Sequence, residues 1–277
     1  MADPCSPRAD QQSLPGYRVE VNAPAGPESG PDPQRQALRI ELVVLLAVTY
    51  GLSALTAMLD LADSVLRDLG SRRIALNPRR SYFDLIDLGL NAAWAVQLLS
   101  WGALAVYLLW RSGIGPARIG LGRFAGRADG LGAIGLAALI GIPGLGLYLA
   151  ARLLGVNAEV IPAAVNDTWW RLPMLLVIAF ANGWAEEVIV VGYLLTRLQQ
   201  LQVRPLPALA CSALLRGAYH LYQGFGAGLG NVAMGLVFGW VWQRHGRLWP
   251  LILAHALIDA VAFVGYAVLG RHLGWLH

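Results

Sequence analysis

Six ionisable side chains of this 277-residue chain lie well inside long apolar segments. They are Glu186, Glu187, Arg216, His220, His255 and Asp259. An ionisable group in such a segment is costly to bury and by default marks a functional site. All six fall in three segments of the last hundred residues or so, and the first three apolar segments contain none at comparable depth. We therefore expect the chemistry of this protein near its C-terminal end.

The spacing of these groups predicts how they share helix faces. Arg216 and His220 are four residues apart, as are His255 and Asp259, so each pair lies on one face of a helix. Glu186 and Glu187 are adjacent and diverge by about 100° around a helix. We therefore expect that they do not point at one spot, and that one acts while the other supports it. Three helices that bring acids and imidazoles to similar depth would enclose a polar cavity.

Acids and imidazoles in such a cavity can hydrolyse a carbonyl compound. A carboxylate paired with an imidazole can take a proton from an attacking water. A second imidazole, held by an acid one turn away, can donate to the oxyanion that develops. Asn182 lies one turn before Glu186 and can line the same cavity.

Two other hydrolytic mechanisms have weaker support. Ser212 and Cys211 lie in an apolar segment but lack a G-x-S-x-G elbow or another pattern that supports a nucleophile. Zinc held by Glu186, His220 and His255 is the second choice, although the H-E-x-x-H arrangement is absent. Water activated without a cofactor is the first choice.

The elements that must position these groups are transmembrane helices. Hydrophobic residues make up 56% of the chain and charged residues 14%, against about 25% charged residues in soluble domains. Apolar blocks of a length that can span a bilayer predict seven helices, at Leu42–Leu59, Leu88–Trp110, Leu131–Ala151, Leu172–Leu195, Leu206–Tyr222, Phe225–Trp242 and Leu248–Leu269. The fold class predicted is an all-α polytopic membrane protein.

The remaining segments complete the predicted organisation. Residues 1–38 are rich in Pro, Gly, Asp and Gln and are predicted to be a disordered tail before a membrane domain at 39–277. The segment Leu61–Ile74 is too charged to cross a bilayer, and could form an eighth, amphipathic helix at the interface.

The charge and cysteine content of the chain indicate where the protein is located and which partners it binds. The distribution of Arg favours a cytoplasmic N-terminus, and the composition is typical of a bacterial plasma membrane protein. Scattered Arg residues without a basic stripe exclude nucleic acid as a partner. Cys5 and Cys211 cannot form a disulfide framework or a cysteine zinc site. The expected partners are the lipid bilayer and a peptide or protein substrate.

Three motifs of the C-terminal third resemble those of a known family. They are E-E-V-I-V-V-G-Y-L-L from Glu186, L-L-R-G-A-Y-H-L-Y from Leu214 and L-A-H-A-L-I-D from Leu253. Their order and spacing are similar to the E-E-x-x-x-R, F-x-x-x-H and H-x-x-x-N/D pattern of the CPBP (Abi) family of CAAX-prenyl endopeptidases and bacteriocin-processing proteins. The resemblance covers residues 172–270.

The resemblance implies an intramembrane endopeptidase with assigned roles. Glu186 would activate water with His220 as its partner, His255 and Asp259 would stabilise the oxyanion, and Glu187 would support them. Members of the family are described both as metalloproteases and as glutamic proteases, and the glutamic type is favoured here because no third strong ligand accompanies the two histidines. Prenylated CAAX peptides are the substrates that the family name suggests.

The chain departs from the family pattern at two positions. Val191 replaces the motif Arg, and Arg216 replaces the motif Phe. One explanation is a decayed site. The preferred hypothesis is a positional exchange in which the Arg216 guanidinium pairs with Glu187, because a lone buried charge would be very costly.

Two other function classes remain as alternatives. In a proton-coupled transporter the Glu and His cluster would relay protons, but broken helices would be expected in two corresponding halves. A catalytically inactive scaffold or immunity protein would tolerate a neutral residue in place of Glu186. A purely structural polar network is the corresponding non-functional interpretation.

Overall fold

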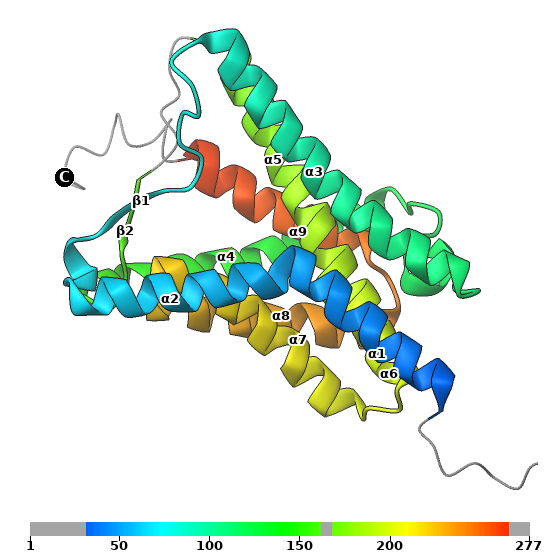
Figure 1. Ribbon diagram of the computed structural model, residues 1–277. Helices are drawn as coiled ribbons and strands as arrows, with labels where there is room; N and C mark the ends of the chain where they lie inside the picture. The colour runs from blue at the N-terminus through cyan, green and yellow to red at the C-terminus, as the bar shows by residue number, and fades with distance from the viewer. Residues whose placement is uncertain (1–31, 162–167, 266–277) are drawn as a thin grey trace, which may run out of the picture.

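The computed structural model describes residues 32–161 and 168–265, and they are almost entirely helical (Figure 1). The helices are α1 (Pro33–Leu46), α2 (Leu52–Leu66), α3 (Asp84–Arg111), α4 (Arg127–Leu153), α5 (Arg171–Glu186), α6 (Leu194–Gln200), α7 (Pro205–Tyr219), α8 (Phe225–His245) and α9 (Trp249–Ala260). Strands β1 (Arg73–Ala75) and β2 (Glu159–Ile161) form a small parallel sheet. A π-helical turn joins α1 to α2 and another joins α5 to α6, so each pair is one continuous helix.

Five of these continuous helices are long and apolar enough to cross a membrane. They are Pro33–Leu66, Asp84–Arg111, Arg127–Leu153, Arg171–Gln200 and Phe225–His245. The predicted all-α polytopic class is therefore confirmed, and the chain is an integral membrane protein.

The other two predicted spans lie in shorter helices. Helix α7 has 15 residues, which is about 22 Å at 1.5 Å per residue, and the hydrocarbon core is roughly 30 Å thick. Helix α9 and the π-helical turn that follows it form an apolar helix at Trp249–Val264. The end of the predicted block, residues 266–269, lies outside the described residues. Seven full spans are thus not seen in the described part of the chain.

Two predicted boundaries near the N-terminus are wrong. Helix α1 begins at Pro33, inside the predicted 1–38 tail, because Asp32 caps it by accepting a hydrogen bond from the backbone amide of Gln34 at 3.0 Å. Residues 1–31 lie outside the described residues. The predicted interfacial helix at Leu61–Ile74 does not form, because Leu61–Leu66 continue the first long helix and strand β1 follows.

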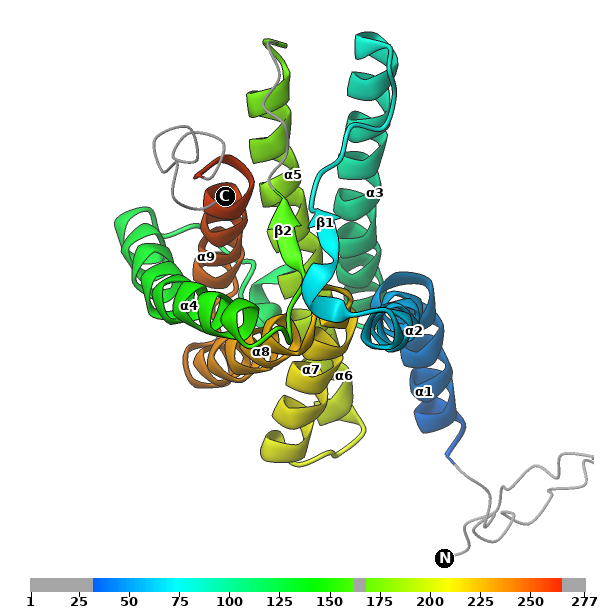
Figure 2. The same ribbon diagram turned by 90° about the vertical axis from the view of Figure 1, so that its left-hand side faces the viewer.

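Helix α5 lies at the centre of the molecule and is the most buried of the long helices. Helices α3 and α9 pack against it, and α9 also packs against α4. Helices α7 and α8 pack against each other, and α2 lies against α7 (Figures 1 and 2). Helices α5, α7 and α9 carry the six ionisable groups, so this arrangement brings their three segments to one region.

The arginines at the two ends of the helices form different sets of ion pairs. At one end Arg197 bonds Glu41 at 2.6 Å, and Arg247 bonds Asp129 at 2.6 Å. At the other end the Arg171 guanidinium lies 3.4 Å from Asp87, which is only 2% exposed. Asp87 is thus a buried member of an ion pair at the start of α3. A cytoplasmic N-terminus and a bacterial plasma membrane stay predictions.

The close approach of α5 to α9 depends on Gly183. A Cβ at this position would lie 2.8 Å from the Ile252 carbonyl oxygen and 3.3 Å from the His255 Cβ. Contacts this short with backbone atoms cannot be relieved by moving a side chain. Gly183 therefore sets the distance between the helices that carry Glu186 and His255.

We predict that Gly183→Ala destabilises the protein by about 1–3 kcal/mol, as overpacking does. The measurement is thermal unfolding in detergent, with Gly135→Ala in α4 as the matched control. Nothing lies within 4 Å of a Cβ at Gly135, so the control should be neutral or slightly stabilising. Equal stabilities of the two variants would contradict the role given to Gly183.

Candidate active site

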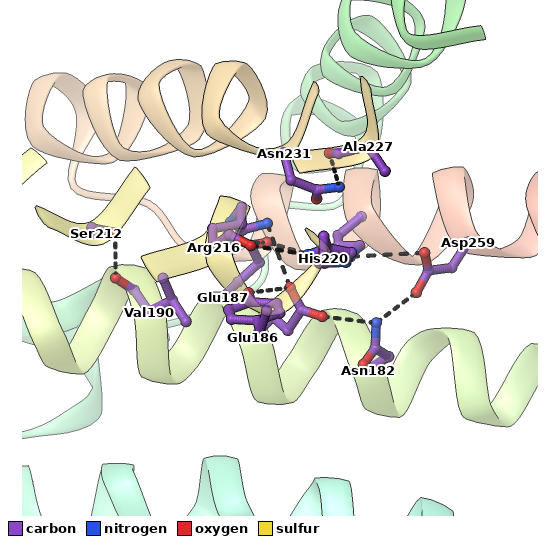
Figure 3. A network of polar contacts seen from close by, with 12 residues as sticks. Asn182, Glu186, Glu187, Val190, Ser212, Arg216, His220, Ala227, Asn231 and Asp259 are labelled. Atoms are coloured by element: carbon purple, nitrogen blue, oxygen red, sulfur yellow. Dashed lines mark hydrogen bonds and ion pairs between the residues drawn. The ribbon is translucent and has the colours of Figure 1, made fainter. Parts of the chain in front are cut away.

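Six side chains from α5, α7, α9 and the turn after α5 form a closed ring of polar contacts (Figure 3). In order around the ring they are Glu186, Asn182, Asp259, His255, Glu187 and Arg216. The predicted groups thus converge, although they lie up to 77 residues apart in the sequence. The side chain of His220 is not part of this ring, but it contacts the backbone carbonyl of Arg216.

Glu186 is held by hydrogen-bond donors from two helices. Its Oε1 accepts from Asn182 Nδ2 at 3.2 Å, and its Oε2 accepts from the Tyr219 hydroxyl at 2.5 Å. The guanidinium of Arg216 lies 3.8 Å from Oε2. The carboxylate is 3% exposed, so these contacts replace the solvation that it loses on burial.

Glu187 forms the predicted ion pair with Arg216. Arg216 NH2 donates to Glu187 Oε1 at 2.7 Å, and both residues are completely buried. This contact confirms the positional-exchange hypothesis as far as the pairing is concerned. Val191, at the position of the motif Arg, is also buried.

The expectation that the side chains of Glu186 and Glu187 do not point at one spot is wrong. Both carboxylates lie near the guanidinium of Arg216, at 3.8 and 2.7 Å. The helix changes from α to π at Glu187, so the 100° step of an α-helix does not describe this junction. In addition, the guanidinium is a wide fork with five donor hydrogens.

Among residues 32–161 and 168–265, π-helical turns occur at three places, each next to polar groups of the ring or to a residue that contacts it. One starts at Glu187, one at Val261 directly after Asp259 and its neighbour Ala260, and one spans Ala47–Gly51 and contains Tyr50. π-Turns inside helices are rare and are frequent at functional sites. Their positions therefore support a functional interpretation of the ring.

His220 lies at the C-terminal end of α7 rather than inside a helix. It is the residue after Tyr219, and its Nδ1 lies 3.0 Å from the carbonyl oxygen of Arg216. A carbonyl oxygen only accepts, so Nδ1 carries the proton of this contact and Nε2 stays available. The contact also satisfies one of the last carbonyls of the helix. No hydrogen bond joins His220 to Glu186 in the described residues.

His255 faces a carboxylate with each ring nitrogen. Its Nδ1 lies 2.7 Å from Glu187 Oε1, and its Nε2 lies 3.8 Å from Asp259 Oδ1. The second distance is longer than a hydrogen bond. Asp259 is in turn held by Asn182 at 2.8 Å, so Nε2 can donate to another oxygen.

The residues do not fit the alternative zinc site. Within residues 32–161 and 168–265 no three His, Cys, Asp or Glu side chains are close enough together to hold a metal ion. Glu186, His220 and His255, the ligands considered for zinc, are instead bonded to Tyr219, the backbone of Arg216 and Glu187. The buried positive charge of Arg216 also disfavours a divalent cation.

Two tyrosines at the site were not predicted. Tyr219 donates to Glu186, and Tyr50 stacks on Tyr219 with ring centroids 4.7 Å apart. Tyr219 directly precedes His220, so its position in the sequence could have indicated that it lies at the site. Tyr50 lies in an apolar block without a charged residue, so the sequence contains no signal for it.

Other polar residues of the same helices have structural contacts. The Ser212 hydroxyl donates to the Val190 carbonyl at 2.7 Å, and Asn231 donates to the Ala227 carbonyl at 3.0 Å (Figure 3). Cys211 lies on an exposed side of α7. Ser212 and Asn231 thus bond backbone carbonyls and not members of the polar ring.

Comparison with known proteins gives a family for the part of the chain that holds the site. Residues 168–261 match the model of the family described as type II CAAX prenyl endopeptidase Rce1-like. No curated protein and no solved structure matches the chain. The matched segment contains every member of the polar ring, and the helices before it lie outside the match. Residues 168–261 are thus similar to the Rce1-like family of type II CAAX prenyl endopeptidases.

Proposed function

We propose that this protein is a glutamic intramembrane endopeptidase in which Glu186 activates water to hydrolyse a peptide bond. The observation that carries the proposal is the buried carboxylate of Glu186, held by Tyr219 and Asn182. The His220 ring lies 4.7 Å from the Tyr219 ring, and His255 contacts the adjacent Glu187. A carboxylate fixed in an apolar site is suited to general base catalysis. The family match supports the same reaction class.

The reaction proceeds by addition of water and loss of an amine. Glu186 takes one proton from water while the water oxygen bonds to the carbonyl carbon, and the π electrons of the carbonyl move to its oxygen. The tetrahedral intermediate then collapses, the C–N bond breaks, and the amine leaves with the proton that Glu186 returns. The products are a carboxylic acid and an amine.

The histidines have separate roles in this proposal. Nε2 of His220 positions the attacking water, since Nδ1 is engaged by the carbonyl of Arg216. Nε2 of His255 donates to the oxyanion. The carboxylate of Asp259 stabilises the positive charge that the imidazole of His255 carries. Glu187 and Arg216 are positioning residues, because they contact His255 and Glu186 rather than the reacting atoms.

We predict that chelators leave the activity unchanged. The reason is that Glu186, His220 and His255 are bonded to protein groups and form no metal-ligand set. The measurement is the cleavage rate of the purified protein with and without 1,10-phenanthroline, together with elemental analysis. Loss of activity that stoichiometric zinc restores would contradict the metal-independent mechanism.

The function is tested with a peptide in a lipid bilayer. The purified protein in nanodiscs is incubated with a farnesylated CAAX peptide and with the same peptide without its lipid, and mass spectrometry identifies new C-termini. Hydrolysis between the modified Cys and the residue after it would support the CAAX substrate class, and cleavage of the unmodified peptide alone would support another membrane peptide.

The alternatives predict different results in the same membranes. A proton-coupled transporter would hydrolyse neither peptide and would move protons together with a solute in proteoliposomes. A scaffold or immunity protein would do neither. Either result would overturn the protease proposal.

A further inference from the structure

Tyr50 places a second phenol beside Tyr219, from a helix outside the segment that matches the family model. The residue is 5% exposed, and its hydroxyl is buried without a hydrogen-bond partner among residues 32–161 and 168–265. Its ring stacks on the ring of Tyr219, and the Tyr219 hydroxyl donates to Glu186. Only Tyr219 therefore separates Tyr50 from the candidate catalytic carboxylate.

A break in the regular α-helix determines the backbone position of Tyr50. It lies in the π-helical turn Ala47–Gly51, which interrupts a 34-residue helix. The turn needs a glycine at its end, since a Cβ at Gly51 would lie 2.8 Å from the Leu46 carbonyl oxygen. The Thr49 hydroxyl donates to the Leu45 carbonyl at 2.8 Å and supports the same turn.

Aromatic contacts hold the ring of Tyr50 in place. Its ring stacks on Tyr219 at an interplanar angle of 29° and meets Trp101 edge to face at 5.8 Å. Tyr219 itself donates to Glu186. Phenylalanine could make both ring contacts without burying an unpaired hydroxyl, which is costly. Packing therefore explains the ring of Tyr50 but not its hydroxyl.

The hydroxyl can meet a need of the proposed reaction. The oxygen of the scissile carbonyl becomes negative when water adds, and donors that are already in place stabilise it most effectively. The Tyr219 hydroxyl is committed to Glu186, whereas the Tyr50 hydroxyl is uncommitted within the described residues. A rigid phenol without a protein acceptor is suited to donate to that oxygen.

We propose that the Tyr50 hydroxyl is a catalytic hydrogen-bond donor to the carbonyl oxygen of the scissile peptide, acting together with His255. This inference rests on the proposed protease function. It makes the first long helix part of the active site. The reaction itself is unchanged, since Tyr50 keeps its proton throughout and only shares it with the oxyanion.

The test is Tyr50→Phe, which keeps both ring contacts. Loss of one donor from an oxyanion site lowers kcat by about 10²–10³-fold, and we expect a decrease of about 10²-fold with little change in KM for a farnesylated CAAX peptide. Tyr193→Phe is the matched control, because Tyr193 is a buried tyrosine whose hydroxyl bonds Glu41 rather than the ring. A kcat for Tyr50→Phe equal to that of the wild type would overturn the inference.

A second measurement separates catalysis from structure. A peptide aldehyde forms a hydrate that resembles the tetrahedral intermediate, so its Ki should rise in Tyr50→Phe by about the same factor by which kcat falls. A merely structural role would lower Tm and leave the ratio of Ki to KM unchanged, and this result would also overturn the inference. If Glu186→Gln still cleaves the peptide, the proposed function fails; if only Tyr50→Phe is silent, this inference alone fails.

Discussion

Glu186→Gln is expected to lower kcat for peptide cleavage by at least about 10³-fold, within the range that general acid–base catalysis contributes. Glutamine has nearly the same shape and can still accept from Tyr219, which donates to Glu186 Oε2 at 2.5 Å. It cannot take a proton from water at neutral pH. The variant should therefore fold and enter the membrane normally while the chemical step is lost.

The measurement is kcat and KM of purified protein in nanodiscs with a farnesylated CAAX peptide. The matched control is Glu41→Gln, since Glu41 also pairs with a buried Arg and accepts from a tyrosine, but at the end of the helices next to Arg197. This control should keep its activity. Cleavage by Glu186→Gln at the wild-type rate would exclude Glu186 as the base and, with it, the mechanism proposed.

Arg216→Leu is expected to destabilise the protein by about 3–5 kcal/mol, the usual cost of removing one partner of a buried ion pair. Its guanidinium is the only one that contacts the ring in the described residues, and it lies close to both Glu186 and Glu187. Leucine would leave these two acids buried without the guanidinium. His255 cannot replace it, because this imidazole already faces Glu187 and Asp259.

Thermal unfolding in detergent measures this effect. Arg204→Leu is the control, because Arg204 is an exposed arginine just before α7, and such substitutions usually change stability by no more than about 0.5 kcal/mol. The double variant Arg216→Leu with Glu187→Gln should recover part of the loss, since contacting residues are coupled. Silent Arg216→Leu and Glu187→Gln variants would show that the pair contributes nothing to folding or activity.

A variant that moves the arginine back to the position of the family motif also tests the pairing of Arg216 with Glu187. Val191→Arg combined with Arg216→Phe restores the residue types of the family motif. If the guanidinium can serve Glu187 from either helix, the double variant should be more stable than Arg216→Phe alone. Val191 is completely buried. If the double variant and Arg216→Phe are equally unstable, the packing around residue 191 does not accommodate an arginine side chain.

Much of the site could be predicted from residue types and spacing. Ionisable groups are so costly in apolar helices that their mere positions identified Glu186, Glu187, Arg216, His220, His255 and Asp259. The same cost predicted that Arg216 would pair with an acid on another helix, and the pair with Glu187 is present. These predictions needed only the charge of a side chain and the polarity of its neighbours.

The predictions that failed concern backbone geometry. Apolar length predicted a full span at Leu206–Tyr222, but α7 ends at Tyr219 and has only 15 residues. The separation of Glu186 and Glu187 was predicted from an ideal α-helix, and the helix changes at that point. Hydropathy does not distinguish an α-helix from a π-turn, since both bury the same side chains.

The sequence by itself determined that this is an all-α membrane protein and which few residues can do chemistry, because the free energy of a buried charge depends on local polarity. Only the tertiary structure decided how those residues meet. Asn182 bridges Glu186 and Asp259, and Tyr219 rather than His220 bonds Glu186. Tyr50 of the first long helix stacks on Tyr219. These contacts depend on how the helices cross and turn, which residue spacing within one helix does not specify.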